Sequence, residues 1–332
     1  MSTREANPTE ALRATDPLFA KLSPFVAAAE WPQMLEHIAE IKRLKEERNA
    51  VILAHNYQRP EIFHTIADIT GDSLALARKA LHTTAEVIVM CGVHFMAETA
   101  KLTCPEKRVL IPDPEAGCSL ASSITAADVA ALRAQHPGVP VVTYVNSSAE
   151  VKAASDICCT SGNAVKIVRS LGVPRVIFLP DAYLGAYVQQ ETGIELILWQ
   201  GHCEVHEKFT AADIAKVRTQ HPDVFVLAHP ECALDVLEAA DFVGSTAVMA
   251  DYVEKHRPPT VFFVTECSLI DNIAVVTPEV NFIRPCHLCP HMQRITLANV
   301  AAALRHMQTE VHIAPEVAGP ARAAIDAMLA VP

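Results

Sequence analysis

The sequence predicts an α/β protein made of three homologous α/β sandwich domains, with short parallel sheets arranged around a pseudo-threefold axis. Short runs of branched apolar residues alternate with Ala-rich amphipathic stretches, which is the pattern of parallel strands joined by helices. Three cysteines, Cys118, Cys203 and Cys289, stand 85 and 86 residues apart. This spacing is too long for a local metal-binding finger and indicates that each of three repeats contributes one thiol.

The expected elements follow the chain in three similar sets. A helix at 31–49 precedes the first repeat, whose strands are expected at 51–54, 86–91 and 108–111. The second repeat has expected strands at 141–145, 175–179 and 195–199, and the third at 224–228, 260–264 and 281–283. Helices are expected at 74–81, 164–171 and 246–255. Because parallel strands need a crossover connection, we expect the helices to cover the sheets.

Two further landmarks repeat in register with the cysteines. Each repeat has an Asp before apolar residues and a hydroxyl side chain five positions later: Asp68 and Ser73, Asp156 and Ser161, Asp241 and Thr246. We therefore divide the chain into an N-terminal helical extension, three α/β repeats and a C-terminal tail: residues 1–48, 49–136, 137–220, 221–305 and 306–332.

The composition excludes several classes of protein. Hydrophobic residues make up 51% of the 332 residues and aromatic residues only 5%, which favours α/β architecture over a β-sandwich. The net charge of −11, without a basic block, argues against nucleic acid as a partner. No apolar run approaches the roughly 20 residues that span a membrane, and the first residues do not resemble a signal peptide. We expect a cytoplasmic protein whose ten cysteines are reduced.

Polar residues follow the first strand of each repeat in pairs. In open parallel sheets ligands bind at the carboxyl ends of the strands, and residues at i and i+2 point to the same side. The pairs are His55 and Tyr57, Tyr144 and Asn146, and His229 and Glu231. The hydroxyls of Ser73, Ser161 and Thr246 precede helices, whose N-termini bind phosphates and carboxylates. We expect these groups and the three thiols to face one central cavity that holds a small polyanion.

Thiol ligands without an evident fourth protein ligand favour an iron–sulfur cluster over zinc, with one metal position open. By interval alone Cys286 fits nearly as well as Cys289, so the third ligand stays open at this point. Four histidines flank the cysteines, and we interpret them as supporting or surface residues: His202, His206, His287 and His291. The remaining cysteines we interpret as core or structural residues: Cys91, Cys104, Cys158, Cys159, Cys232 and Cys267.

Several motifs between about residues 51 and 300 resemble the iron–sulfur quinolinate synthase family. They are Ala54-His-Asn-Tyr-Gln58, Gly71-Asp-Ser73, Gly92-Val-His-Phe-Met96, Pro112-Asp-Pro-Glu-Ala-Gly-Cys118, Tyr144-Val-Asn-Ser-Ser-Ala149, Cys159-Thr-Ser-Gly-Asn-Ala164, Trp199-Gln-Gly-His-Cys203, His229-Pro-Glu-Cys232, Gly244-Ser-Thr246 and Cys289-Pro-His-Met292. The resemblance implies three α/β domains and a [4Fe–4S] cluster with three cysteine ligands and one open iron. It selects Cys289, the cysteine before Pro-x-Met, over Cys286.

The resemblance also implies a reaction. Family members condense iminoaspartate with dihydroxyacetone phosphate to quinolinate, with loss of phosphate and water, in de novo NAD biosynthesis; L-aspartate oxidase would supply the imine. The implied proton-transfer groups are His55, Tyr57, Tyr144, His229 and Glu231. The implied substrate-binding residues are His55, Ser73, Tyr144, Asn146, Ser161, His229, Glu231 and Thr246. A CxxCxxC motif in some members is associated with a redox-sensitive disulfide, whereas only Cys286 and Cys289 are present here.

Two alternatives stay open on the sequence. One is a different [4Fe–4S] hydro-lyase or isomerase on the same scaffold, which would keep the open iron and use other acids. The other is a non-catalytic cluster-binding sensor, which would not need the inner hydroxyls. The sequence gives no indication of the oligomeric state.

Overall fold

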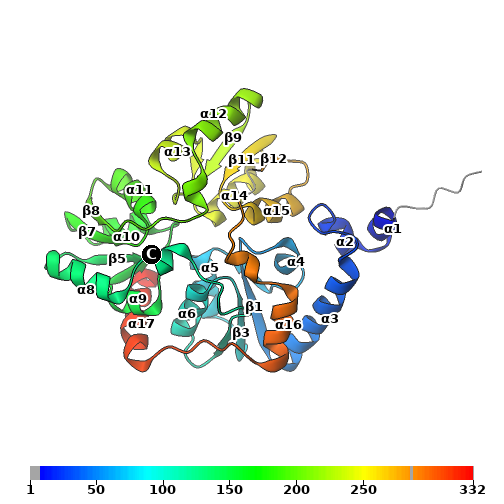
Figure 1. Cartoon of the computed structure of the whole chain (residues 1–332), viewed down its shortest axis with the longest axis horizontal. Helices are drawn as coiled ribbons and strands as arrows, with labels where there is room; N and C mark the ends of the chain where they lie inside the picture. Colours follow the sequence, from blue (N-terminus) through cyan, green and yellow to red (C-terminus); the bar gives the residue numbers. More distant parts are fainter. Residues whose placement is uncertain (1–7, 285–286, 332) are drawn as a thin grey trace, which may run out of the picture.

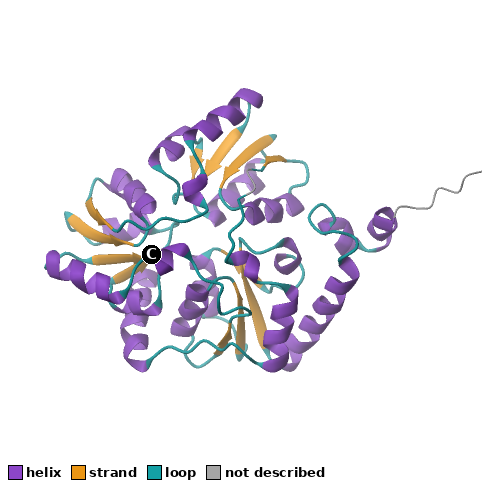
Figure 2. Cartoon of the chain, in the orientation of Figure 1, coloured by secondary structure: helices purple, strands orange, loops and turns teal. Residues whose placement is uncertain are grey.

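The computed structural model describes residues 8–284 and 287–331. Three four-stranded sheets form three lobes around a common centre (Figure 1), and all their strand pairs are parallel. The strand orders are equivalent: β2-β1-β3-β4, β6-β5-β7-β8 and β10-β9-β11-β12. Helices lie against the strands of every lobe (Figure 2). The predicted fold class, three α/β domains with short parallel sheets, is confirmed.

The first lobe contains β1 (Ala50–His55), α4 (Pro60–Phe63), β2 (Ile69–Gly71), α5 (Ser73–Ala80), β3 (Val87–Cys91), α6 (His94–Thr103), β4 (Arg108–Leu110) and α7 (Ser119–Ser122). The second contains α8 (Ala126–Gln135), β5 (Val141–Tyr144), α9 (Ala149–Ala153), β6 (Ile157–Cys159), α10 (Ala164–Ser170), β7 (Arg175–Leu179), α11 (Ala182–Thr192), β8 (Glu195–Leu198) and the 3₁₀ turn η1 (His206–Lys208). The third contains α12 (Ala211–Gln220), β9 (Phe225–Ala228), α13 (Leu234–Ala239), β10 (Phe242–Val243), α14 (Thr246–His256), β11 (Thr260–Val264), α15 (Cys267–Val276), β12 (Asn281–Ile283) and η2 (Met292–Arg294).

Five helices of the described residues lie outside the three lobes. Before the first lobe come α1 (Pro8–Thr15), α2 (Pro17–Leu22) and α3 (Trp31–Glu47), and after the third lobe come α16 (Leu297–His306) and α17 (Pro315–Ala330). Helix α16 packs against α3, and α17 packs against α9 and β6 of the second lobe (Figure 1). Helix α17 buries Ala321, Ala324, Ile325 and Met328, the spacing of one helical face. The residue boundaries of the repeats stay a prediction.

The central strands are buried on both faces, as expected for sheets covered by helices on each side. Every residue of β3 is buried, and so is β1 from Val51 onward. This explains why the strands appear in the sequence as continuous apolar runs rather than as alternating patterns. Among the described residues, no helix has the length and apolar content needed to cross a lipid bilayer.

The repeated Asp fastens the second strand of each sheet to the first. One carboxylate oxygen accepts a main-chain N–H of the first strand in each lobe: Ile52 to Asp68 at 2.8 Å, Val141 to Asp156 at 2.7 Å, and Val226 to Asp241 at 2.8 Å. The preceding helix supplies a cation to the same Asp: Lys45, Arg133 and Arg218 respectively. This landmark of the sequence is therefore a structural clamp, and it lies outside the central site.

We expect Asp241→Ala to lower the free energy of unfolding by about 2 kcal/mol, because the N–H of Val226 loses its acceptor. The matched control is Asp251→Ala, which breaks an exposed ion pair with Lys255 and should change stability by about 0.5 kcal/mol or less. Urea denaturation of both variants measures the difference. Equal effects at the two positions would contradict the clamp.

Candidate functional site

The carboxyl ends of the first strands of all three sheets face one central site with two adjacent ends that share lining residues. One end is lined by the three thiols of Cys118, Cys203 and Cys289. The other is lined by the hydroxyls of Ser73, Ser161 and Thr246. His55, Tyr57 and Glu231 line both ends, Asn146 lines the thiol end, and His229 lines the hydroxyl end. Tyr144 lies directly behind Glu231 and is buried. The structure thus brings together all the residues that the sequence selected.

The three cysteines occupy equivalent turns. In each lobe, the first residue of the helix after the third strand donates its N–H to the carbonyl two positions before the cysteine: His94 to Ala116, Ala182 to Gly201, and Cys267 to His287, at 2.7, 2.9 and 3.1 Å. The carbonyl of each cysteine then accepts the N–H four residues later: Ser122, Glu207 and Gln293. Cys289 therefore has the same main-chain position as Cys118 and Cys203. Cys286 lies outside the described residues.

A capping box follows each cysteine at the same distance. Thr125, Thr210 and Thr296 begin α8, α12 and α16, and each bonds reciprocally with the residue three positions on. Each Thr stands seven residues after Cys118, Cys203 or Cys289. This Thr-x-x-Asp/Asn pattern is visible in the sequence. It would have separated Cys289 from Cys286 without any resemblance.

The thiols are suited to a metal centre by their burial. Burial raises the pKa of Cys118 to about 12 and that of Cys289 to about 11, and it holds the pKa of Cys203 well above the ordinary value. A thiol in such surroundings keeps its proton unless a metal ion replaces it. Three convergent buried thiols therefore fit a soft metal or cluster.

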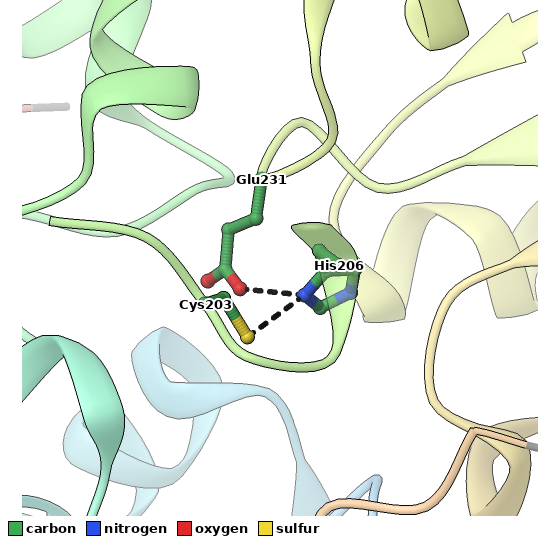
Figure 3. Close-up of side chains that lie close together, drawn as sticks. All are labelled: Cys203, His206 and Glu231. Carbon is green, nitrogen blue, oxygen red and sulfur yellow. Dashed lines mark hydrogen bonds and ion pairs between the residues drawn. The ribbon is translucent and has the colours of Figure 1, made fainter. Parts of the chain in front are cut away.

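A second group of potential ligands overlaps the first. The ligand atoms of Cys203, His206 and Glu231 all lie within 4.8 Å of one another. Figure 3 shows Cys203 and Glu231 on the same side of the His206 ring, both contacting Nδ1, which lies 3.1 Å from the Cys203 sulfur and 2.8 Å from Glu231 Oε2. His206 is only 1% exposed. The interpretation of His206 as a supporting or surface residue therefore understated its position, since it lies at the centre of the site.

His206 connects Glu231 to Tyr57 through Thr265, a residue that the sequence analysis missed. His206 Nε2 lies 2.9 Å from Thr265 Oγ1, and the Tyr57 hydroxyl lies 2.7 Å from the same oxygen. Burial holds the pKa of Tyr57 well above its ordinary value, so its hydroxyl is protonated. The four side chains form one continuous hydrogen-bonded chain.

Glu231 is the anchor of the site. Its Oε1 accepts the Tyr144 hydroxyl at 2.5 Å and the Asn146 amide at 3.5 Å, while Oε2 contacts His206. Burial by itself would raise the pKa of Glu231, but the neighbouring imidazoles and the hydrogen bonds that it accepts hold the pKa below the ordinary value. Glu231 is therefore a charged carboxylate inside the protein.

The two strand-end histidines are neutral and share one tautomer. Burial lowers the pKa of His55 to about 4 and that of His229 to about 3, against an opposing effect of Glu231. Nδ1 of His55 accepts the N–H of Tyr57 at 3.1 Å, and Nδ1 of His229 accepts the N–H of Glu231 at 3.3 Å. Because Nδ1 is the acceptor in both rings, Nε2 carries the hydrogen. Both histidines therefore present N–H donors.

We expect the protein to lose stability as the pH falls from 6.5, the ordinary pKa of histidine, toward 4, the lowered pKa of His55. In this interval the unfolded chain binds protons that the folded chain excludes, so acid favours unfolding, whereas above it this contribution to stability is fully present. His55→Gln should reduce the decline in thermal midpoint across this range, and the exposed His312→Gln should leave it unchanged. A wild-type midpoint that stays flat across the range would contradict this.

The predicted hydroxyls are not helix caps. The N-cap positions of α5, α10 and α14 are held by Asp72, Asn163 and Ser245 instead. Ser73 and Thr246 are the first residues of their helices, and Ser161 lies in the turn before α10. Ser245 donates to Asp72 across the centre at 3.3 Å, which joins the third lobe to the first. The hydroxyls of the predicted residues are thus free of the capping role and line the cavity.

Comparisons with known proteins identify a matching family model and several similar chains. The family model described as "Quinolinate synthetase A protein" matches residues 39–330. Quinolinate synthase 2 of Mesorhizobium japonicum is 63% identical over 314 residues, covering 95% of this chain and 97% of that protein. Quinolinate synthase of Agrobacterium fabrum is 62% identical over 312 residues, covering 94% and 90%. Quinolinate synthase of Xylella fastidiosa strain Temecula1 is 64% identical over 294 residues, covering 89% and 87%.

Proposed function

The chain belongs to the quinolinate synthetase A family, and from that premise we propose that it condenses iminoaspartate with dihydroxyacetone phosphate to quinolinate, releasing phosphate and water. It is an enzyme of small-molecule substrates, and its product is the pyridine ring used in NAD synthesis. The observation that carries the proposal is the site between the lobes, where buried thiols, neutral imidazoles, a charged carboxylate and three hydroxyls meet.

Cys118, Cys203 and Cys289 would hold a [4Fe–4S] cluster, one ligand from each repeat. Their burial and their equivalent main-chain turns support an equal role for the three thiols. Three thiols for four irons leave one iron without a protein ligand, and the bound cluster would there supply a Lewis acid to a substrate oxygen or nitrogen.

The hydroxyl end would bind the anionic groups of the substrates. Iminoaspartate carries carboxylates and dihydroxyacetone phosphate carries a phosphate, and the chain as a whole is acidic, so binding needs local donors. Ser73, Ser161 and Thr246 line this end, and Ser73 and Thr246 are the first residues of helices, whose N-terminal N–H groups favour anions. Asn146, whose Oδ1 is buried and has no hydrogen-bond partner in the described protein, would accept a substrate N–H or O–H.

The chain from Tyr57 to Glu231 has a defined direction. Charged Glu231 accepts the Nδ1 hydrogen of His206, so His206 Nε2 is left as an acceptor for the Thr265 hydroxyl. Thr265 in turn accepts the hydrogen of Tyr57. When the Tyr57 hydroxyl acts as a base on substrate, its proton can pass through Thr265 to His206, and Glu231 stabilises the resulting imidazolium. Tyr57 is therefore assigned the proton transfers of enolisation and ring closure.

His55, His229 and Tyr144 would act differently. The Nε2–H groups of the two neutral histidines are hydrogen-bond donors, suited to hold a substrate oxygen, including that of a hydroxyl that leaves as water. Tyr144 donates to Glu231 and fixes that carboxylate in place. These assignments distinguish one base, Tyr57, from two hydrogen-bond donors, His55 and His229, a distinction that the residue types alone do not make.

We extend the proposal to supply and location. Because an imine of this kind hydrolyses in water, an oxidase that forms it from L-aspartate is the expected supplier, and the reaction is assigned to the cytoplasm.

The deciding experiment uses anaerobically purified protein. It should contain about four irons and four sulfides per chain, and it should form quinolinate when iminoaspartate is generated in the presence of dihydroxyacetone phosphate. Cluster-loaded protein that makes no quinolinate would refute the synthase. Activity on other small dicarboxylates would then indicate a hydro-lyase on the same scaffold, and its absence would indicate a cluster-binding sensor.

A further inference from the structure

Asn56 stands between His55 and Tyr57 in the sequence, but its side chain serves the opposite lobe. Its Nδ2 donates to Thr246 Oγ1 at 3.0 Å, across 190 positions of the chain. Asn56 is 7% exposed and Thr246 is 3% exposed, so water does not compete for this bond. The bond joins the loop after β1 to the start of α14.

The main chain around Asn56 is fixed on both sides. Its N–H donates to the carbonyl of Gly71 at 3.0 Å, and its carbonyl accepts Nδ2 of Asn272 at 3.1 Å. The same Nδ2 donates to the carbonyl of Gln58 at 2.8 Å, so Asn272 of α15 holds the whole loop. Because the loop cannot shift without breaking these bonds, the side chain of Asn56 is held beside Thr246, to which its Nδ2 donates.

This bond decides what the Thr246 hydroxyl can do. A hydroxyl has one hydrogen to donate, and here its oxygen already accepts from Asn56. The hydrogen of Thr246 is therefore free to point into the hydroxyl end of the site, which Thr246 lines. A partner that accepted from Thr246 would instead turn that hydrogen away from the cavity.

We propose that Asn56 is a positioning residue that makes Thr246 a hydrogen-bond donor to an anionic oxygen of the substrate, either a carboxylate or a phosphate oxygen. This rests on the proposed function for the identity of the substrates. The other two repeats have Val145 and Pro230 at the position of Asn56, which cannot donate from a side chain. In the second repeat, Ser161 is instead a hydrogen-bond partner of Tyr144. The hydroxyl of the third repeat, Thr246, is therefore oriented by a hydrogen bond from Asn56 that has no equivalent in the other two repeats.

The test reverses the polarity at position 56. In Asn56→Asp the new carboxylate only accepts, so it should capture the Thr246 hydrogen and raise the dissociation constant of inorganic phosphate or of succinate about 10- to 100-fold. The anion that weakens identifies the bound group as a phosphate or a carboxylate. In turnover, KM for the corresponding substrate should rise while kcat changes less than about threefold, a split that a general loss of structure would not give.

The control is a double-mutant cycle with Thr246→Val, which removes the hydroxyl and keeps the shape. If Asn56 acts through Thr246, Asn56→Asp should have little further effect in the Thr246→Val background, within about twofold. An equal loss in both backgrounds would overturn the proposal, because the new charge would then act directly. An Asn56→Asp variant that binds both anions as wild type does would overturn it as well.

Two further measurements keep the result interpretable. If Asn56→Asp does not fold, Asn56→Leu takes its place, because it removes the donor without adding charge. It should weaken anion binding about threefold when Thr246 is present and leave it unchanged in the Thr246→Val background. An equal loss in both backgrounds would refute the proposal. Binding of phosphate or succinate needs no turnover. The positioning role can therefore fail in an enzyme that makes quinolinate, and it can hold in a protein that does not.

Discussion

We expect that replacing Cys118, Cys203 or Cys289 by serine abolishes stable [4Fe–4S] binding in each case. A serine hydroxyl is a hard, weakly acidic ligand, and each of these side chains is the sole thiol that its repeat directs to the shared cavity in the described chain. Anaerobic iron and sulfide analysis should fall from about four of each per chain to nearly none. Quinolinate formation should fall with it.

Two other cysteines serve as controls. Cys286→Ser should keep the cluster, because the turn that holds the third thiol is built around Cys289. Cys232→Ser should keep it as well, since this buried thiol is bonded to the carbonyl of Val264 and not to the cavity, and a hydroxyl can replace that bond. Loss of the cluster in Cys286→Ser with retention in Cys289→Ser would reverse the ligand assignment.

The parts of the fold and site that could be predicted are those that occur three times. The strand-end pairs, the Asp clamps and the thiols keep their register because each lobe is the same supersecondary unit, and a parallel sheet brings its strand ends to one edge. A signal that recurs at fixed spacing is therefore visible without coordinates. The Thr capping box after each cysteine belongs to the same class and could have been used to choose Cys289.

The residues that could not be predicted are those that break the threefold pattern. His206 stands three positions after Cys203, where the other repeats have Ala121 and Met292. The same holds for Thr265, which stands two positions before Cys267, and for Asn56. Neither residue has a polar counterpart in either of the other two lobes. The reacting molecule is not threefold symmetric, so its acids and bases cannot be either. A comparison of the three repeats therefore identifies the residues of the common scaffold and misses the residues that distinguish one lobe from another.

Glu231→Gln should lower kcat about 10³- to 10⁴-fold while the iron content stays unchanged. Tyr144 donates to one oxygen of Glu231, so the amide of the glutamine keeps its carbonyl toward Tyr144 and turns its NH₂ toward His206. His206 must then accept at Nδ1 and carry its hydrogen on Nε2. Thr265 would receive that hydrogen and direct its own toward Tyr57, so the direction of the whole chain is reversed.

The variant Thr265→Val tests whether the hydrogen-bonded chain from Tyr57 to Glu231 must only be continuous or must also have its hydrogens pointing in one direction. It removes the Thr265 bridge between Tyr57 and His206 and leaves only the direct 3.5 Å contact between the Tyr57 hydroxyl and His206 Nε2. Glu231 stays charged and His206 keeps its original tautomer, so the loss in kcat should be smaller, about 10²-fold. In the double variant the two losses should not add, because a chain already cut at Thr265 cannot be harmed by a reversal further along. Full additivity would mean that Glu231 acts on the substrate by itself, and a Glu231→Gln enzyme within about tenfold of wild type would mean that the carboxylate charge has no part in proton transfer.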